Sequence, residues 1–236
     1  VYRTMKAAVD DIAAGDVPAI HAHEKALRHL RNGVTIASMG WNIGTAAMQP
    51  LGITNSIVRI GPKWVGRGVK RWIGDAAKME NTAAWIFEVS PFMKDRVFTQ
   101  SREINDIRNQ MRGRGKLSWV EDSYFWFITR MQMTVDIPTW LGAYEKAQSE
   151  GATEANAISM ADQAVIDAQG GGQIKDLAQI QRGHPALKLF TNFISYFVTT
   201  WNLMAERYRL NKFESMADAG RFASDFLLLY TVPAVL

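Results

Sequence analysis

The chain has 236 residues, long enough for one large or two small domains. Of these residues 47% are hydrophobic and 21% charged, a balance typical of globular proteins. Its net charge of +4 is below the excess expected of a dedicated nucleic-acid-binding protein. It contains no cysteine, which excludes disulfides, thiolate metal sites and cysteine nucleophiles. The chain begins at Val1, shows no signal-peptide pattern and ends in an apolar run, so we expect a fragment of a longer polypeptide.

Residues 2–31 have apolar positions at helical spacing, and the run 32–58 that follows contains no charged residue. Within this run two glycines four residues apart flank a tryptophan, a spacing that lets two helix backbones approach closely. Pro50 is predicted to end or kink this helix. A buried bundle helix, a helix that inserts conditionally into a membrane and an oligomer seam all fit the pattern. The candidate helix-contact or membrane residues here are Gly40, Trp41 and Gly44.

A cationic helix is predicted over residues 62–73, with a proline in its first turn. Its lysines and arginines are three or four residues apart and so share one face, while Trp64 and Trp72 supply an apolar counterpart. Such a face suits a membrane surface, a phosphate backbone or plain solvent. With two arginines of the later basic loop, the candidate phosphate contacts are Lys63, Arg67, Lys70, Arg71, Arg112 and Arg114.

The middle of the chain carries two further helix starts. Ser90 is predicted to cap a helix that begins at Pro91 and carries a seam of apolar residues as far as residue 111. A capping box over residues 118–121 opens a helix that is apolar on nearly every side, which is typical of the centre of a bundle.

The one internal cation of that central helix is Arg130, which we expect to pair with Glu121, Asp122 or Asp136, since an unpaired buried charge is too costly. Pro138 is predicted to kink or restart the helix.

In the last third, Gly151 is predicted to end one helix and Thr153 to cap the next, which runs to Gln169 and is followed by a glycine triplet that resembles a hinge. An uncharged stretch over 191–204 then carries aromatic residues at spacings of three and four, and 222–236 has a single charge. The candidate helix-contact or membrane residues here are Phe190, Phe193, Phe197 and Trp201.

No alternating strand pattern, βαβ pattern or internal repeat is present. The sequence therefore predicts an all-α fold, an extended or bundled array of about nine or ten helices without a sheet. We expect two parts, N-terminal helices over 1–116 and a hydrophobic helical region over 117–236.

Motifs of catalysis are not evident in the sequence. His21, His23 and His29 lack the spacing of a helical zinc site, and the glycine triplet lacks the lysine of a phosphate-binding loop. Asp162 and Asp167 are five residues apart and do not share a helix face. We therefore predict no enzyme, no catalytic, cofactor or metal site, and no small-molecule substrate.

One set of residues at expected turns and helix contacts carries a resemblance: Gln49, Pro50, Leu51, Gly52, Gly61, Pro62, Lys63, Trp64, Trp140, Ala143, Tyr144, Gly151, Glu154, Ala157, Ile158, Ala161, Asp162, Gln169, Gly170, Asp176, Leu177, Ala178, Gln181, Arg182, Gly183, Leu189 and Phe190. The set resembles the polyvalent or internal virion proteins of phages and prophages, some of which are ejected with the genome by short-tailed phages. It covers most of residues 25–210. Gly171 stands where we expect a serine, a departure at the hinge.

The resemblance implies a structural component of the virion interior that passes into the host envelope with the genome and meets other copies of itself or other virion proteins. It carries over no catalytic residue. Helices with local contacts also suit a protein that must refold quickly after ejection. Two alternatives stay open, namely a membrane-active, channel-forming module and a non-catalytic, nucleic-acid-contacting part of a large virion enzyme such as a virion RNA polymerase.

Overall fold

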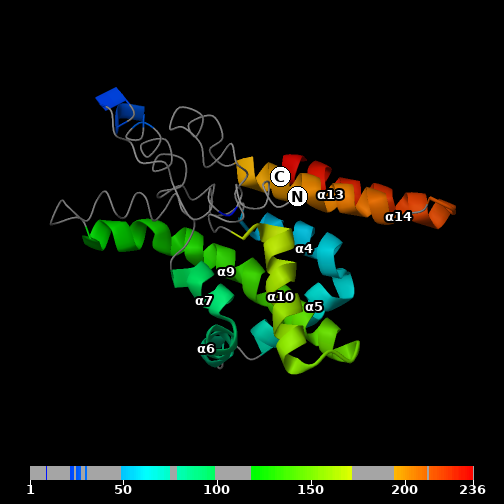
Figure 1. Ribbon diagram of the computed structural model, residues 1–236, viewed down its shortest axis with the longest axis horizontal. Helices are drawn as coiled ribbons and strands as arrows, with labels where there is room; N and C mark the ends of the chain where they lie inside the picture. Colours follow the sequence, from blue (N-terminus) through cyan, green and yellow to red (C-terminus); the bar gives the residue numbers. More distant parts are fainter. Residues whose placement is uncertain are drawn as a thin grey trace. The chain divides into compact units, whose positions relative to one another are not determined.

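The computed structural model describes residues 49–74, 79–98, 118–171, 194–211 and 213–235, together with residues 9, 22, 23, 25–27 and 30 (Figure 1). Within these residues it has nine α-helices and no strand, which confirms the all-α prediction. The elements are η1 (Gln49–Gly52), α4 (Ile53–Ile60), α5 (Pro62–Gly74), α6 (Met79–Val89), α7 (Pro91–Phe98), α9 (Ser118–Ser149), α10 (Glu154–Gln169), α13 (Ile194–Leu210), α14 (Met216–Phe226), the π-helical η5 (Leu227–Thr231) and α15 (Val232–Val235).

Two compact units divide the chain, and the second of them holds most of the described residues. This unit consists of 43–98, 128–171 and 196–236, so its segments come from both sides of residue 116. The packing described below is that of this unit.

Several helix boundaries fall where the sequence predicts them. Helices α5 and α7 each begin at a proline, and the backbone amide of Met93 donates to Ser90 Oγ at 3.0 Å. Thr153 caps α10 by accepting from the amide of Asn156 at 3.4 Å. Gly151, which follows α9, has φ of 84°, a conformation that costs glycine little because it has no Cβ. Local chain chemistry therefore sets these boundaries.

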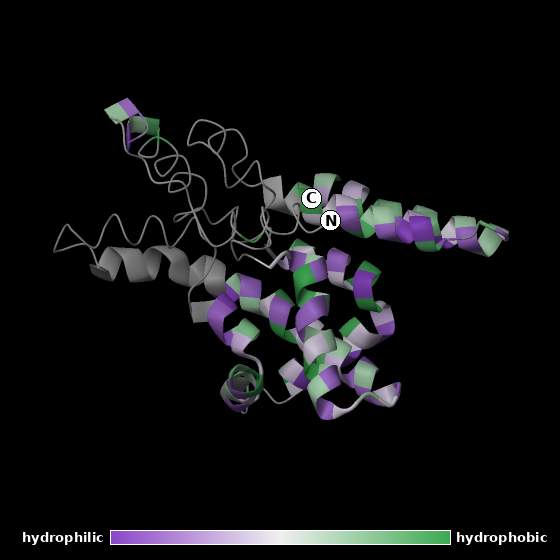
Figure 2. Cartoon of the chain, in the orientation of Figure 1, coloured by the Kyte–Doolittle hydropathy of each residue, from purple (hydrophilic) through white to green (hydrophobic). Residues whose placement is uncertain are grey.

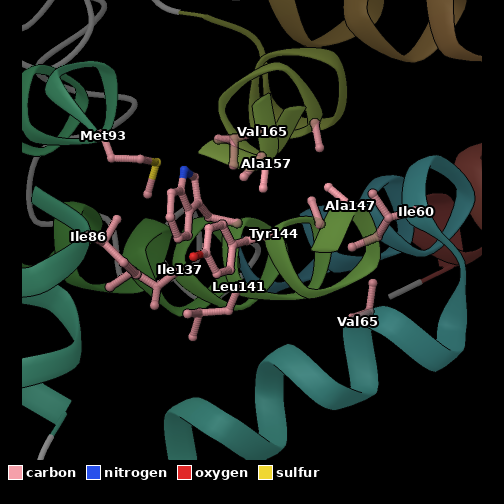
Figure 3. Packing of buried hydrophobic residues seen from close by; sticks show 14 residues of the cluster. Ile60, Val65, Ile86, Met93, Ile137, Leu141, Tyr144, Ala147, Ala157 and Val165 are labelled. Carbon is pink, nitrogen blue, oxygen red and sulfur yellow. The ribbon is translucent and has the colours of Figure 1, made fainter. Parts of the chain in front are cut away.

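Helix α9 supplies the centre of the hydrophobic core (Figure 3). Residues 135–144 are all buried, so this part of the helix is covered on every side. The sequence placed such a helix slightly earlier, over 124–135, where the side chains up to residue 129 lie outside the described part. Helix α9 continues through Pro138 to Ser149 as one element, so the alternative of a helix restart at this proline is wrong.

Two glycines let α5 and α9 touch backbone to backbone. A Cβ on Gly68 would fall on the carbonyl oxygen of Pro138 and lie 2.9 Å from the amide nitrogen of Gly142. A Cβ on Gly142 would lie 2.8 Å from the carbonyl carbon of Trp64. Since real Cβ atoms do not approach backbone atoms this closely, only glycine fits at either position. The sequence predicted a close helix contact at Gly40 and Gly44, which lie outside the described residues, and not at this crossing.

Helices α13 and α14–η5–α15 form an antiparallel hairpin (Figure 1). Leu203 and Met204 of α13 pack with Leu229 of η5 and with Val58 of α4 in a small second cluster. Ser215 opens α14 with a capping box that the sequence reading missed. Among the residues that the structure describes, this cluster has four buried members, fewer than the core around α9.

Candidate functional site

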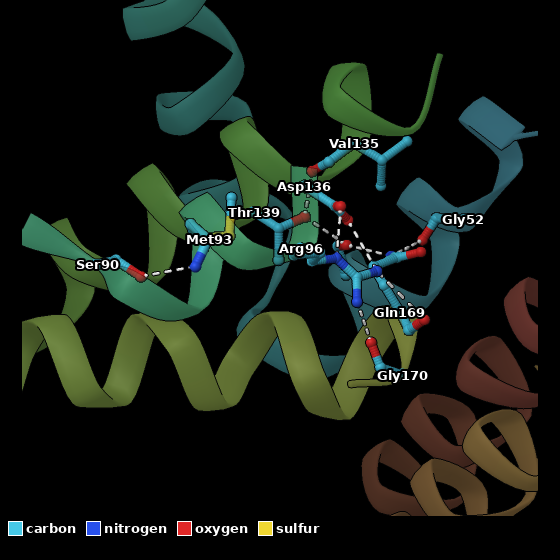
Figure 4. Close-up of polar contacts among 10 residues, drawn as sticks. Gly52, Ser90, Met93, Arg96, Val135, Asp136, Thr139, Gln169 and Gly170 are labelled. Atoms are coloured by element: carbon cyan, nitrogen blue, oxygen red, sulfur yellow. Dashed lines mark hydrogen bonds and ion pairs between the residues drawn. The ribbon is translucent and has the colours of Figure 1, made fainter. Parts of the chain in front are cut away.

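A polar junction surrounds the C-terminal end of α10, where the last backbone carbonyls of a helix have no partner within it (Figure 4). Arg96 of α7 donates to the Gly170 carbonyl and, at 2.7 Å, to Asp136 Oδ2 of α9. The Asn55 side chain of α4 donates to the Ala168 carbonyl at 3.0 Å. The arginine is also a cation at the negative end of the α10 dipole. Three helices are thus tied to one helix end.

A second chain of hydrogen bonds extends this junction towards η1. Gln169 Nε2 donates to the Gly52 carbonyl at 2.7 Å and to Ser56 Oγ at 3.0 Å. Ser56 and Thr139 share a hydroxyl–hydroxyl bond of 2.6 Å. These polar groups hydrogen-bond to one another. The chemical role of the junction is therefore structural, because it holds η1, α4, α9 and α10 together.

Asp136 was one of three acids expected to pair with Arg130, and its partner is instead Arg96. The side chains of this pair are 6% and 2% exposed, so it is a buried ion pair. Arg130 is exposed, which removes the reason for requiring a buried carboxylate beside it. Sequence reasoning missed Arg96 because the two partners are 40 residues apart and no local pattern links them.

Asp162 of α10, which is partly buried, forms a second polar site beside the buried Trp140. Its Oδ1 accepts from Ser90 Oγ at 2.6 Å and from Trp140 Nε1 at 2.7 Å. Burial raises the pKa of Asp162, and the two hydrogen bonds act against that rise. Trp140 in turn stacks on Tyr144, with ring centroids 5.2 Å apart. Asp167 lies elsewhere, paired with Arg59 at 2.7 Å.

We expect Asp162→Asn to unfold at a higher urea concentration than the parent at pH 7, and the difference to shrink towards pH 4. A folded-state pKa raised above the unfolded value gives a contribution to stability that is present at low pH and lost as the pH rises through the folded pKa. Asparagine keeps the accepting Oδ1 but carries no charge, so it escapes this loss. Asp162→Ala instead leaves the buried Trp140 Nε1 without an acceptor and should cost about 1–3 kcal/mol. Equal effects of both changes at pH 7 would contradict this.

The cationic helix α5 has the face that the sequence predicts. Lys63, Arg67, Lys70 and Arg71 are all exposed. Arg71 pairs with Glu145 of α9 at 3.3 Å. The other three have no carboxylate partner among the residues that the structure describes. Arg112 and Arg114, the remaining candidate phosphate contacts, lie outside those residues.

Two of the apolar candidates can be placed on α13. Phe197 and Trp201 are each 68% exposed, although both are large apolar side chains. Met204, three residues later, is buried, so the aromatic spacing spans two faces of the helix. Trp41, Phe190 and Phe193, the other members of this group, lie outside the described part of the chain, as do the glycine candidates of the uncharged run.

An open groove of about 930 Å³ lies where the α4–α5 junction meets α13 and α14. Its lining is mixed, and the arginines in it are paired with acids, Arg207 with Asp225 at 3.4 Å and Arg221 with Asp218 at 2.8 Å. Burial raises the pKa of Asp225, and the charge of Arg207 acts against that rise. Glu214 also lines the groove, so three acids face two arginines and the groove has no surplus of positive charge for an anionic ligand.

No group of three or more histidine and acidic side chains that could hold a metal ion occurs in the part of the chain that the structure describes. Among the helices with assigned positions, none combines the length and the hydropathy that crossing a membrane requires.

No protein-family model, curated protein or solved structure matches this chain.

Proposed function

We propose that this chain is a structural protein of a phage virion, stored in the particle interior and ejected with the genome, which assembles through helix contacts and assists genome delivery through the host envelope. One observation supports the proposed assembly through helix contacts. Of the thirteen large apolar side chains that are exposed among the described residues, nine lie between Phe197 and Val235. Exposed apolar surface gathered in one part of a protein, here the α13–α15 hairpin, is typical of an interaction site.

The α13 helix is the part of this surface best suited to a partner helix. Trp201 and Tyr208 are 68% and 64% exposed, and they lie seven residues apart on one stripe. From Ile194 to Ala205 the helix has no charge that would have to be desolvated in a contact. Figure 2 shows hydrophobic residues along the same hairpin, interspersed with hydrophilic ones. The partner is another copy of this chain or another virion protein, as the resemblance to internal virion proteins suggests.

The test is the solution mass of the chain, measured by sedimentation velocity over a range of concentrations, with the variant Trp201→Glu. We expect the parent to form an oligomer whose dissociation constant rises at least tenfold in the variant, because a charge in an apolar contact must be desolvated without a partner. Met160→Glu is the matched control, since Met160 is an exposed apolar residue of α10, 47% exposed, away from the hairpin.

A parent chain that stays monomeric at every concentration would overturn assembly with other copies of this chain. An oligomer that Trp201→Glu and Met160→Glu weaken equally would overturn the proposed helix contact, because the contact would then not lie on α13. Circular dichroism of both variants should match the parent, as each changes a solvent-facing side chain.

A further inference from the structure

The segment Ile53–Gly74, which forms α4 and α5, contains five cationic residues and no acidic one. Two of the five are neutralised by carboxylates on other helices, Arg59 by Asp167 at 2.7 Å and Arg71 by Glu145 at 3.3 Å. The remaining three are Lys63, Arg67 and Lys70. This local excess of positive charge is present although the whole chain has a net charge of only +4.

These three cations, which we name the α5 cationic face, form one exposed row along the helix. At about 1.5 Å of rise per residue, the row from Lys63 to Lys70 spans roughly 10 Å. A duplex presents one phosphate per roughly 3.4 Å of axis on each strand, so the row can meet several phosphates of a backbone. Lys63 Nζ and Arg67 Cζ both lie 4.8 Å from the centre of the Trp64 ring. This cation–π contact holds both charges at one place on the surface.

The direction of the apolar side of α5 distinguishes nucleic acid from a membrane. A helix that binds a membrane surface must place its apolar face into the lipid. In α5 that face is already occupied, because Val65 is 4% exposed and Trp64 and Trp72 pack against the core. Ile73 is the one large apolar side chain of the helix that is exposed. The outward face of α5 is therefore charged and lacks an apolar surface that could insert into a lipid bilayer.

We propose that the α5 cationic face binds the phosphate backbone of double-stranded DNA without preference for sequence. Cations held outward on a rigid helix contact phosphates, and nothing on this face is arranged to read base edges. The inference stands on α5 alone and does not depend on assembly through α13.

The experiment measures the affinity of the chain for a fluorescent DNA duplex of mixed sequence by anisotropy at several salt concentrations. Three neutralised phosphates predict a slope of about −2.7 for log K against log salt. The triple variant Lys63→Gln, Arg67→Gln, Lys70→Gln should bind at least about tenfold more weakly and lose most of that slope. The single variants Lys63→Gln and Lys70→Gln should each reduce the slope by about 0.9, which keeps the test open if the triple variant folds poorly.

The matched control is the triple variant Lys94→Gln, Arg209→Gln, Arg221→Gln, which removes the same charge from exposed positions of α7, α13 and α14. It should keep the parent slope. A flat salt response of the parent, or an equal loss of affinity in both triple variants, would overturn the proposal. So would binding to vesicles of anionic phospholipid that depends on the α5 cationic face and that excess duplex does not displace, since the surface would then serve lipid.

Discussion

Gly68→Ala and Gly142→Ala are expected to destabilise the protein strongly, whereas Gly66→Ala on the same helix should stabilise it. A methyl group at Gly68 would overlap the Pro138 carbonyl, and both partners are backbone, so neither can rotate away. Overpacking of this kind typically lowers the free energy of unfolding by about 1–3 kcal/mol. We expect a loss of about 3 kcal/mol or more here, because α5 must move away from α9. Gly66 has nothing within 4 Å of its added Cβ, so it gains the helix propensity of alanine, up to about 1 kcal/mol.

Urea unfolding followed by circular dichroism measures all three variants, with the midpoint as readout. A loss of α5 packing should also expose Trp64 and Trp72, which shifts tryptophan emission to longer wavelength. If Gly68→Ala and Gly66→Ala had the same midpoint, the backbone contact between α5 and α9 would not exist in solution.

Arg96→Met is the second substitution with a large expected effect, a loss of about 3–5 kcal/mol in the free energy of unfolding. It leaves the Asp136 carboxylate buried without its cation and the Gly170 carbonyl without its donor. Burial raises the pKa of Asp136, and the charge of Arg96 acts against that rise, so in the variant the acid takes up a proton more easily. A raised folded-state pKa adds stability at low pH, so the loss should be smaller at pH 5 than at pH 8.

The double variant Arg96→Met, Asp136→Leu should regain much of this loss, because it removes the uncompensated charge as well as its partner. Arg221→Met is the control, since Arg221 is 76% exposed in its pair with Asp218 and its removal should leave the unfolding midpoint nearly unchanged. A single variant as stable as the parent at pH 8 would show that the pair contributes nothing to holding α7, α9 and α10 together.

Residue spacing along a helix could be predicted from the sequence, whereas the exposure of each side chain could not always be. The cationic row of α5 was readable because spacings of three and four define a helix face, and the structure shows those side chains exposed. For the aromatic row of α13, the sequence did not predict which side chains are exposed. Trp201 and Met204 fit one spacing pattern, yet one is exposed and the other buried, since exposure depends on whether another helix covers that side.

By itself, the sequence determined the helical class and many helix boundaries. Proline at a first turn, a serine or threonine cap and glycine at a helix end act within a few residues, so Ser90, Thr153 and Gly151 could be interpreted without knowledge of the fold. Only the tertiary structure decided that Gly68 meets Pro138 and that Arg96 meets Asp136. Those partners are far apart in sequence, and the energy that selects them is backbone packing and desolvation, neither of which leaves a local pattern in the chain.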